Sequence, residues 1–250
     1  MGTLAVIILT KNEEKNIVDC LKNVSFADER IVIDSDSKDK TRELAEKQGA
    51  HVFIHSMSDD GFAGQRNFAL SKTRADWVLY LDADERLSDG LKQEISCVVD
   101  HDRQAAYCMR RINIVFGQRM WYGEHRPDEV VRLFPRGQVY WIGIVHERAE
   151  TKLPVLALSG DIEHYTYTDW NRYFEKFNQY TSLMAKRMDE AGKKVTFCDI
   201  LLHPIFAFIR FYFIRLGFMD GRQGFIFAIN HFYYTMIKYV KCYYHQREGR

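Results

Sequence analysis

Strand-like apolar segments alternate with helical patterns through residues 4–95, and this order constrains the fold more than any other feature of the chain. The first segment, Leu4–Leu9, is a continuous apolar run, as expected of a strand that is buried on both faces. Further strands are predicted at Arg30–Asp34, at His51–Ile54 and at Trp77–Asp82. Strands that alternate with helices form βαβ units, so the sequence predicts an α/β domain with a mostly parallel sheet.

The connecting and later segments complete this prediction. Helices are predicted to begin near Asn12 and to cover residues 41–49 and 62–71. From about residue 105 the pattern changes, because residues 107–111 and 129–134 resemble strands that extend the sheet as a mixed sheet. Residues 170–191 are predicted to be helical.

The C-terminal segment differs in composition from the rest. Aromatic and aliphatic residues dominate residues 197–244, and residues 201–250 hold seven Lys/Arg against two Asp/Glu, a net charge of +5. Arg210 and Arg215 interrupt the first apolar stretch, whereas a spanning helix needs about 20 predominantly apolar residues. Aromatic-rich helices flanked by cations favour a position in the membrane interface. The alternatives are a helical pair packed on the sheet and a dimer interface.

Bulk properties exclude some classes of protein. A formal net charge of +1 gives no indication of nucleic-acid binding, and 46% hydrophobic residues are sufficient for a packed core. The five cysteines form no CxxC pair, so we expect reduced, mostly buried thiols in a cytosolic protein. The N-terminus enters a strand without a basic region and cleavage site, so we do not expect secretion. We predict two domains, residues 1–195 and the helical extension 196–250.

Four polar segments follow predicted strands or open the helix beside them. They are Thr10–Glu13, Asp34–Ser37, Gly64–Asn67 and Asp82–Asp84. In an open α/β sheet the ligand crevice lies outside the carboxyl ends of the strands, so these segments are expected to converge. An Asp-x-Asp there can hold a divalent cation, although it can also be an acidic strand end or a helix N-cap.

The chemistry of these segments suits a nucleotide diphosphate. Small polar groups after the first strand can receive a base or ribose, and a carboxylate after the second can accept a hydrogen bond from either. Arg66 can neutralise a diphosphate, and a cation on Asp84 can bridge to the same group. No G-x-G-x-x-G or Walker sequence is present, which disfavours dinucleotide or ATP binding by those routes.

With these motifs the chain resembles a family 2 glycosyltransferase with the GT-A fold, a Rossmann-like, mostly parallel mixed sheet flanked by helices. The resemblance rests on residues 6–14, 32–41, 64–67 and 81–85. Residues 132–136, 143–147 and 217–225 resemble the lipopolysaccharide-core subgroup, whose members are similar to glucosyltransferases that add a β-linked glucose to an inner-core heptose.

The resemblance implies a UDP-sugar donor and Mg²⁺ or Mn²⁺. It assigns the uridine pocket to Thr10, Asn12 and Glu13, the base or ribose to Asp34, the diphosphate to Arg66, the ribose or donor sugar to Asp82, and the metal to Asp84. In many family members an acidic residue that contacts the uracil follows the position of Asp34. Here Ser35 occupies that position, so we do not expect a carboxylate to contact the uracil there.

The family further implies inversion by a single displacement, which needs a general base near the acceptor hydroxyl. Glu147, in the pair His146-Glu147, is the first candidate and Asp128 the second; alternatively, the pair only shapes the acceptor loop. Arg132 is predicted either to contact an anionic acceptor or to form a structural ion pair. Trp141 is predicted to stack on a sugar ring or to pack in the core.

The expected partners are a UDP-sugar, a lipid A–core acceptor and the cytoplasmic face of the inner membrane, to which the protein would be peripheral. The oligomeric state stays open. A nucleotidyltransferase is disfavoured because Thr10–Glu14 is acidic and lacks glycine, whereas such enzymes use a glycine-rich basic loop. A non-catalytic membrane adaptor on the same fold is disfavoured because Asp84 is present.

Overall fold

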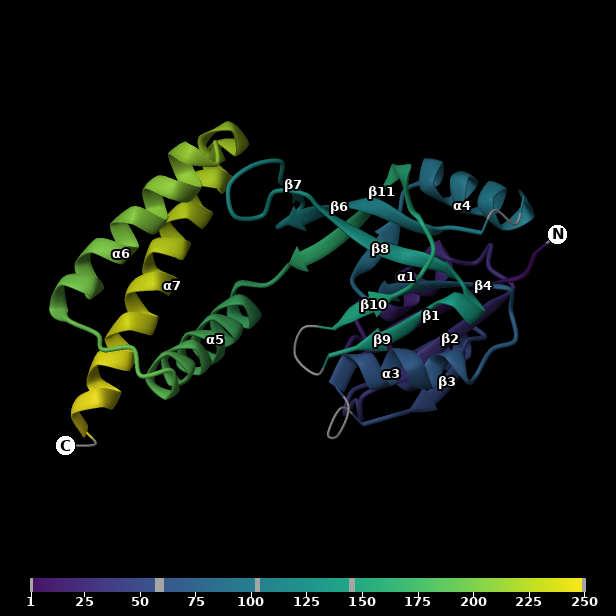
Figure 1. Cartoon of the computed structure of the whole chain (residues 1–250), viewed down its shortest axis with the longest axis horizontal. Helices are drawn as coiled ribbons and strands as arrows, with labels where there is room; N and C mark the ends of the chain where they lie inside the picture. Colours follow the sequence, from purple (N-terminus) through teal and green to yellow (C-terminus); the bar gives the residue numbers. More distant parts are fainter. Residues whose placement is uncertain (1, 57–60, 102–103, 144–146, 249–250) are drawn as a thin grey trace. The chain divides into compact units, whose positions relative to one another are not determined.

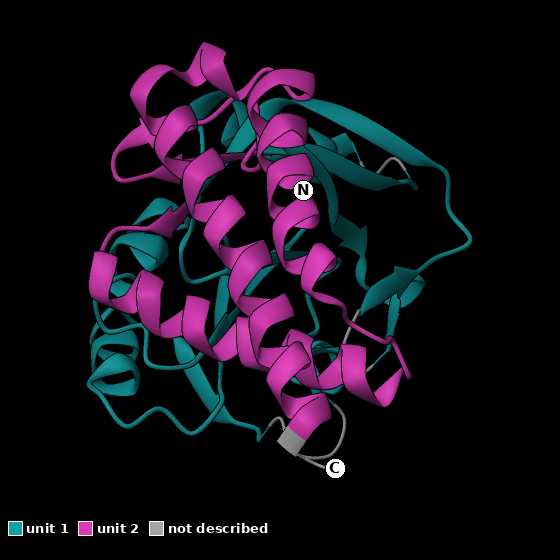
Figure 2. Cartoon of the chain, turned by 90° about the vertical axis from the view of Figure 1, so that its left-hand side faces the viewer, with its two compact units in different colours: residues 1–111, 128–164 teal, residues 112–127, 165–250 magenta. Residues whose placement is uncertain are grey.

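A computed structural model describes residues 2–56, 61–101, 104–143 and 147–248. The chain forms two compact units, which Figure 2 shows in different colours. Unit 1 comprises residues 1–111 and 128–164, and unit 2 comprises residues 112–127 and 165–250. Two long strands contribute residues to both units.

The sheet combines parallel and antiparallel strands (Figure 1). Its strands are β1 (Leu4–Thr10), β2 (Glu29–Asp34), β3 (His51–Ile54), β4 (Trp77–Asp82), β5 (Glu85–Leu87), β6 (Ala106–Val115), β7 (Gln118–Arg119), β8 (Asp128–Pro135) and β11 (Val155–Tyr167). They are ordered β3-β2-β1-β4-β8-β6-β11-β5, with β7 paired to β6. β1 to β4 run parallel, and β8 is antiparallel to β4. The predicted fold class and the strands predicted for the first 95 residues are therefore confirmed.

Both faces of the β1–β4 region are covered by apolar side chains. The helices of unit 1 are α1 (Ile17–Asn23), α2 (Thr41–Lys47), α3 (Gly61–Leu70) and α4 (Asp89–His101). Leu4, Val6 and Ile8 of β1 belong to one core cluster with residues of α1 and α4. Ala5, Ile7 and Leu9 belong to a second cluster with residues of α3. Because successive side chains point to opposite faces, burial on both faces explains the continuous apolar run.

The first helix begins at Ile17, later than predicted. Asn12 has a φ of 56°, in the left-handed region that Asn tolerates better than most residues. Its backbone N–H donates to Ser37 Oγ over 2.8 Å, and its Oδ1 accepts from the Lys38 N–H over 2.8 Å. These bonds keep residues 12–16 as a loop at the carboxyl edge of the sheet, beside the loop that follows β2.

A short hairpin forms a separate two-stranded sheet in unit 1. It follows η1 (Arg136–Gln138) and consists of β9 (Tyr140–Ile142) and β10 (Arg148–Glu150), which pair antiparallel. Ala149 lies opposite Trp141 in this pairing, and Arg148 opposite Ile142. β10 therefore fixes the backbone directly after Glu147.

Unit 2 is mainly helical. It contains α5 (Trp170–Glu190), α6 (Phe197–Ile209), the π-helical segment η2 (Arg210–Ile214), the 3-10 segment η3 (Gly217–Asp220) and α7 (Gly221–Glu248). α6 runs beside α7 (Figure 1). Thr196 and Asp199 form a capping box at the start of α6. A Cβ on Gly224 would lie 1.8 Å from the Gly217 carbonyl oxygen, so the close approach of η3 to α7 requires glycine there.

Two expectations about the C-terminal region differ from the structure. The compact units do not divide at residue 195, because α5 packs on α7 and so belongs with the tail. Despite Arg210, α6 and η2 together form one helical segment, Phe197–Ile214, that by length and composition could cross a membrane. Its mean hydropathy is 1.7 and 22% of it is buried; it is the one such segment among the described residues.

The cysteines are all free thiols. Cys20 and Cys242 are buried, whereas Cys97 and Cys198 are exposed, so the expectation that most of them are buried is wrong.

Candidate active site

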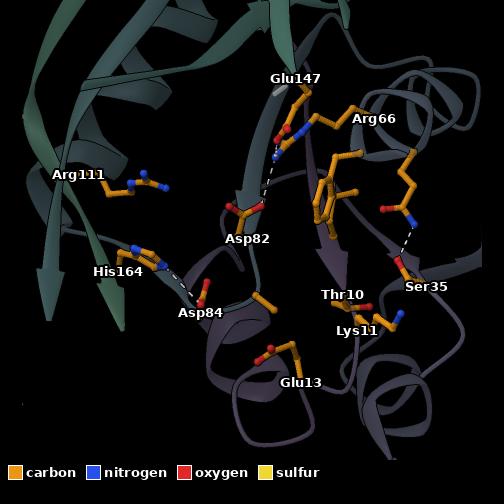
Figure 3. A pocket seen from close by; sticks show the side chains of 14 residues that line it. Thr10, Lys11, Glu13, Ser35, Arg66, Asp82, Asp84, Arg111, Glu147 and His164 are labelled. Carbon is orange, nitrogen blue, oxygen red and sulfur yellow. Dashed lines mark hydrogen bonds and ion pairs between the residues drawn. The ribbon is translucent and has the colours of Figure 1, made fainter. Parts of the chain in front are cut away.

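A cavity of about 420 Å³ lies at the carboxyl edge of β1, β2 and β4, entirely within unit 1 (Figure 3). All four predicted polar segments contribute to its wall, which confirms that they converge. Its lining residues are Leu9, Thr10, Lys11, Glu13, Ser35, Phe62, Gln65, Arg66, Asp82, Ala83, Asp84, Arg111, Glu147 and His164.

Asp34 and Asn12 are not among these lining residues. Asp34 is fully buried beneath the cavity wall, where its carboxylate accepts hydrogen bonds from Thr10 Oγ1 over 3.0 Å and from the Ser37 N–H over 2.9 Å. Ser37 Oγ also donates to it, over 2.5 Å. Asp34 thus connects the end of β1 to the loop after β2. Its carboxylate oxygens accept hydrogen bonds from Thr10 and Ser37 rather than pointing into the cavity.

Ser35 and Gln65 form a polar part of the wall. Gln65 Nε2 donates to Ser35 Oγ over 2.6 Å and to the His55 carbonyl oxygen over 2.7 Å. Gln65 is buried, and its Oε1 accepts no hydrogen bond within the described part of the chain. Ser35, held by the Gln65 amide, is therefore the residue that the loop after β2 contributes to the cavity wall.

Asp82 lies between two arginines. Arg132 Nη2 donates to its Oδ2 over 3.0 Å, and Arg66 Nη2 donates to its Oδ1 over 3.3 Å. Burial alone would raise the pKa of Asp82, but the Arg132 and Arg66 guanidinium groups hold that pKa well below its usual range. Asp82 is therefore ionised at neutral pH.

A buried glutamate extends this network. Glu85 accepts from the Asp82 N–H over 2.9 Å, from Arg132 Nη2 over 3.3 Å and from Arg111 Nη1 over 3.2 Å. Arg132 is buried and forms ion pairs with the carboxylates of Asp82 and Glu85. A structural ion pair is one of the two roles predicted for Arg132. Sequence reasoning did not assign a role to Glu85 or Arg111.

Asp84 has a partner that sequence reasoning missed. His164 Nε2 on β11 lies 3.4 Å from Asp84 Oδ2 (Figure 3). Burial would lower the pKa of His164, but its hydrogen bond to Asp84 raises that pKa above the ordinary value. His164 lies in no recognisable motif; the pairing of β11 with β5, which places it opposite Glu85, brings it here. Carboxylate oxygen and imidazole nitrogen are both ordinary metal ligands, although no group of three or more His, Cys, Asp or Glu suited to a metal occurs among the described residues.

The two described candidates for the base differ in their surroundings. Glu147 lines the cavity, and its Oε1 lies 3.6 Å from Arg66 Nη2. Asp128 is half-exposed and lies outside the lining, held by Arg111 through Nε at 3.0 Å and Nη2 at 2.8 Å. His146, the other candidate, lies outside the described residues.

A second cavity of about 420 Å³ adjoins the first. Its lining residues are Asp82, Arg111, Val130, Val131, Arg132, Trp141, Glu147, Arg148 and Ala149. Asp82, Arg111 and Glu147 line both cavities. Trp141 is largely buried, with its ring 5.0 Å from that of Tyr80 and 4.5 Å from the Arg66 guanidinium carbon, so it packs in the core while one part faces this cavity.

Asn67 connects α3 to the hairpin. Its Nδ2 donates to the Trp141 carbonyl oxygen over 2.8 Å, and its Oδ1 accepts from the Trp141 N–H over 2.9 Å. Consecutive residues of α3 thus hold three different parts of the site: Gln65 holds Ser35, Arg66 holds Asp82, and Asn67 holds β9. Asn67 belongs to a predicted segment, but sequence reasoning gave it no role.

Comparison with known proteins agrees with this geometry. The family model described as "Glycosyl transferase family 2" matches residues 5–155. An uncharacterized glycosyltransferase of Rickettsia prowazekii is 29% identical over 246 residues, which are 92% of this chain and 82% of that protein. The lipopolysaccharide core biosynthesis glycosyltransferase LpsC of Rhizobium meliloti is 28% identical over 251 residues, covering 96% of this chain and 92% of LpsC.

Solved structures with partial likeness include glucosyl-3-phosphoglycerate synthase from Mycobacterium tuberculosis in complex with Mn²⁺, UDP and glucosyl-3-phosphoglycerate. The likeness has a TM-score of 0.36 and 23% identity, and it covers 45% of this chain and 44% of that one. Mannosyl-3-phosphoglycerate synthase from Rubrobacter xylanophilus gives a TM-score of 0.38 at 23% identity, covering 46% and 41%.

Proposed function

This chain belongs to glycosyl transferase family 2, and from that premise we propose that it moves a hexose, glucose in the first instance, from a UDP-sugar to a lipopolysaccharide inner-core heptose with inversion. The observation that carries the proposal is the junction of the two cavities. Because Asp82, Arg111 and Glu147 line both, a donor in one and an acceptor in the other would meet beside two carboxylates.

The first cavity is the proposed donor site. Thr10, Glu13 and Ser35 would contact the uridine. Asn12 and Asp34 would support them, because their hydrogen bonds hold the loop after β1 against the loop after β2. Arg66 would face the diphosphate and Asp82 the ribose or donor sugar. Arg66 Nε and Nη1 are buried without a protein partner in the described part of the chain, which leaves donors available for phosphate oxygens.

Asp84 and His164 are the proposed protein ligands of Mg²⁺ or Mn²⁺. Two protein ligands suit a cation that takes its remaining ligands from diphosphate oxygens and water, and the carboxylate of Asp84 is the hard donor that both ions prefer. When bound, such a cation supplies Lewis acidity toward the leaving diphosphate. His164 extends the predicted site, which named Asp84 alone.

Glu147 is the proposed general base. It lies at the junction of the cavities, where its carboxylate would be within reach of an acceptor hydroxyl, and Arg66 Nη2, 3.6 Å from its Oε1, helps to hold it there. Asp128 is less suitable, because Arg111 occupies both of its carboxylate oxygens and it lines neither cavity. Arg111, held in place by Glu85 and Asp128, would then form a fixed part of the wall of both cavities.

The second cavity is the proposed acceptor site, with Trp141 and Arg132 in its wall. The likeness to LpsC along nearly the whole chain supports a lipopolysaccharide-core acceptor. Because such an acceptor is lipid-linked, we place the enzyme at the cytoplasmic face of the inner membrane, to which it would bind peripherally.

The deciding experiment measures UDP release from a panel of UDP-sugars with a truncated inner-core acceptor. It compares Mn²⁺ with EDTA, and the wild type with Asp84→Ala. We expect release from one sugar that requires both the metal and Asp84. A folded wild-type protein that neither binds UDP nor releases it with any donor would refute the proposal. UDP binding without release would retain the donor site and refute the acceptor.

A further inference from the structure

One face of α6 and η2 carries large apolar side chains that the described residues of unit 2 leave largely exposed. Leu201, Leu202, Ile205, Phe206, Ile209 and Phe213 recur at helical spacing and are 41–65% exposed. We call these six residues the α6 face. The opposite side of the helix is buried: Ile200 packs with Tyr239 and Cys242 of α7, and Pro204 and Ala207 are also buried. α6 is thus apolar on both sides: one side packs on α7, and the other, the α6 face, is exposed.

Charge near this face is positive. Arg210 lies between Ile209 and Phe213 in the same helical segment, and Arg222 lies at the start of α7; both are exposed. The acidic residue of α6, Asp199, lies in the first turn, where its carboxylate accepts from the Thr196 N–H and hydroxyl. An apolar aromatic face with exposed arginines beside it matches a surface that is apolar in its interior and anionic at its headgroups.

From this arrangement we propose that the α6 face lies in the headgroup region of an anionic lipid bilayer, with the axis of α6 parallel to the membrane plane. The apolar side chains would enter the boundary between headgroups and acyl chains, to a depth of about 5–10 Å. Arg210 and Arg222 would contact lipid phosphates.

The packing of unit 2 decides against a spanning position. Phe197–Ile214 satisfies the composition of a membrane span, but its 18 residues correspond to about 27 Å at the rise of an α-helix, against a hydrocarbon core of about 30 Å. More important, α6 packs beside α7 (Figure 1), which carries His231, Lys238 and Lys241. A spanning α6 would draw these side chains into hydrocarbon, where charged groups are strongly disfavoured.

α7 is in turn fixed to α5. Lys241 Nζ donates to Asn178 Oδ1 and to Thr181 Oγ1, each over 2.8 Å. α5 also carries many charged residues, so a span by α6 would require two polar helices to move with it or the packed unit to open. A helix bound in this way is therefore expected to lie on the membrane rather than to cross it.

The α6 face would be the part of the protein that binds the membrane peripherally. Only the choice of the inner membrane rests on the proposed function. Because the face belongs wholly to unit 2, lipid binding and sugar transfer can be measured separately. Failure of one therefore leaves the other intact.

The test is flotation of the full chain with vesicles of phosphatidylcholine, alone or mixed with phosphatidylglycerol. We expect strong binding to the anionic vesicles, partly retained at high salt because apolar burial is not screened. The double variant Leu202→Glu/Phe206→Glu should bind at least about tenfold more weakly, since each change places a charge where the acyl boundary would be. Arg210→Gln/Arg222→Gln should lose the preference for anionic lipid.

The matched control is Ile54→Glu/Val155→Glu, which adds the same charge at two exposed apolar positions of unit 1. It should bind as the wild type does. Circular dichroism and UDP release with a delipidated acceptor should be unchanged in all variants, which verifies folding without a membrane.

Three results would overturn the inference. The first is that Leu202→Glu/Phe206→Glu floats with anionic vesicles to the same extent as the wild type. The second is wild-type protein that resists extraction from vesicles by alkaline carbonate, which indicates a span. The third is a stable lipid-free dimer that this double variant dissociates, which would assign the face to a second copy of the chain.

Discussion

His164 Nε2 lies 3.4 Å from Asp84 Oδ2, although His164 belongs to β11 and Asp84 to the turn between β4 and β5. The antiparallel register of β11 with β5 sets His164 opposite Glu85, directly beside Asp84. An imidazole and a carboxylate held together at the edge of the donor cavity form the metal-binding part of the proposed site.

Replacing His164 by Gln should weaken Mn²⁺ binding in the presence of UDP by at least about 10–100-fold, the range found when even outer residues of metal sites are lost. Gln is similar in size and neutral, so packing against β5 should be preserved. Calorimetric titration of Mn²⁺ into the UDP complex measures the effect. His51→Gln, at an exposed position of β3, is the control. Equal Mn²⁺ affinity in the two variants would remove His164 from the site.

The general base can be identified by comparing two carboxamide variants. Glu147→Gln should lower kcat by about 10²–10⁴-fold, the usual contribution of a positioned acid or base, while UDP affinity changes little. Asp128→Asn should have a much smaller effect on kcat, because Asp128 lines neither cavity and is bound to Arg111. Steady-state kinetics with saturating donor test this. A larger loss in Asp128→Asn would reverse the assignment.

Asn67 is expected to act as a positioning residue for Glu147. Its side chain holds the Trp141 backbone, and β10 pairs with β9 directly after Glu147. Asn67→Ala should lower kcat by about 10²-fold, as expected when a catalytic group is displaced by about 1 Å. The dissociation constant of UDP should be unchanged, because Asn67 does not line the donor cavity.

A control for lost stability is available in the same unit. Asn23 makes an equivalent pair of hydrogen bonds to the Leu87 backbone, over 3.0 and 2.7 Å. Asn23→Ala should lower the melting temperature to a similar extent with a smaller loss of kcat. Equal loss of kcat in both variants would show that Asn67 contributes only stability.

Asp82 should make stability depend on pH in the acid range. Its pKa is lowered in the folded state, so its contribution is fully present above the unfolded value of about 3.9 and is lost as the pH falls through the folded pKa. Asp82→Asn should therefore be less stable than the wild type at pH 7, and the difference should shrink below about pH 4. Urea unfolding at several pH values measures it; a constant difference would contradict the ion-pair network.

Much of unit 1 could be predicted because its information is local. A strand buried on both faces must be largely apolar, so the runs Leu4–Leu9 and Trp77–Asp82 could be predicted as strands from their composition. Parallel strands bring their carboxyl ends to one edge, which is why Thr10, Ser35, Arg66 and Asp84 were expected to meet.

What the sequence determined by itself is thus the α/β class, the family and the edge of the sheet that holds the site. Only the tertiary structure decided that His164 joins Asp84, that Arg132 and Arg111 meet at the buried Glu85, and that Asn67 holds Trp141. It also decided that α6 packs beside α7, which carries His231, Lys238 and Lys241. The reason is that such contacts join residues distant in the chain, and strand register and helix packing, which local periodicity does not encode, select the partner.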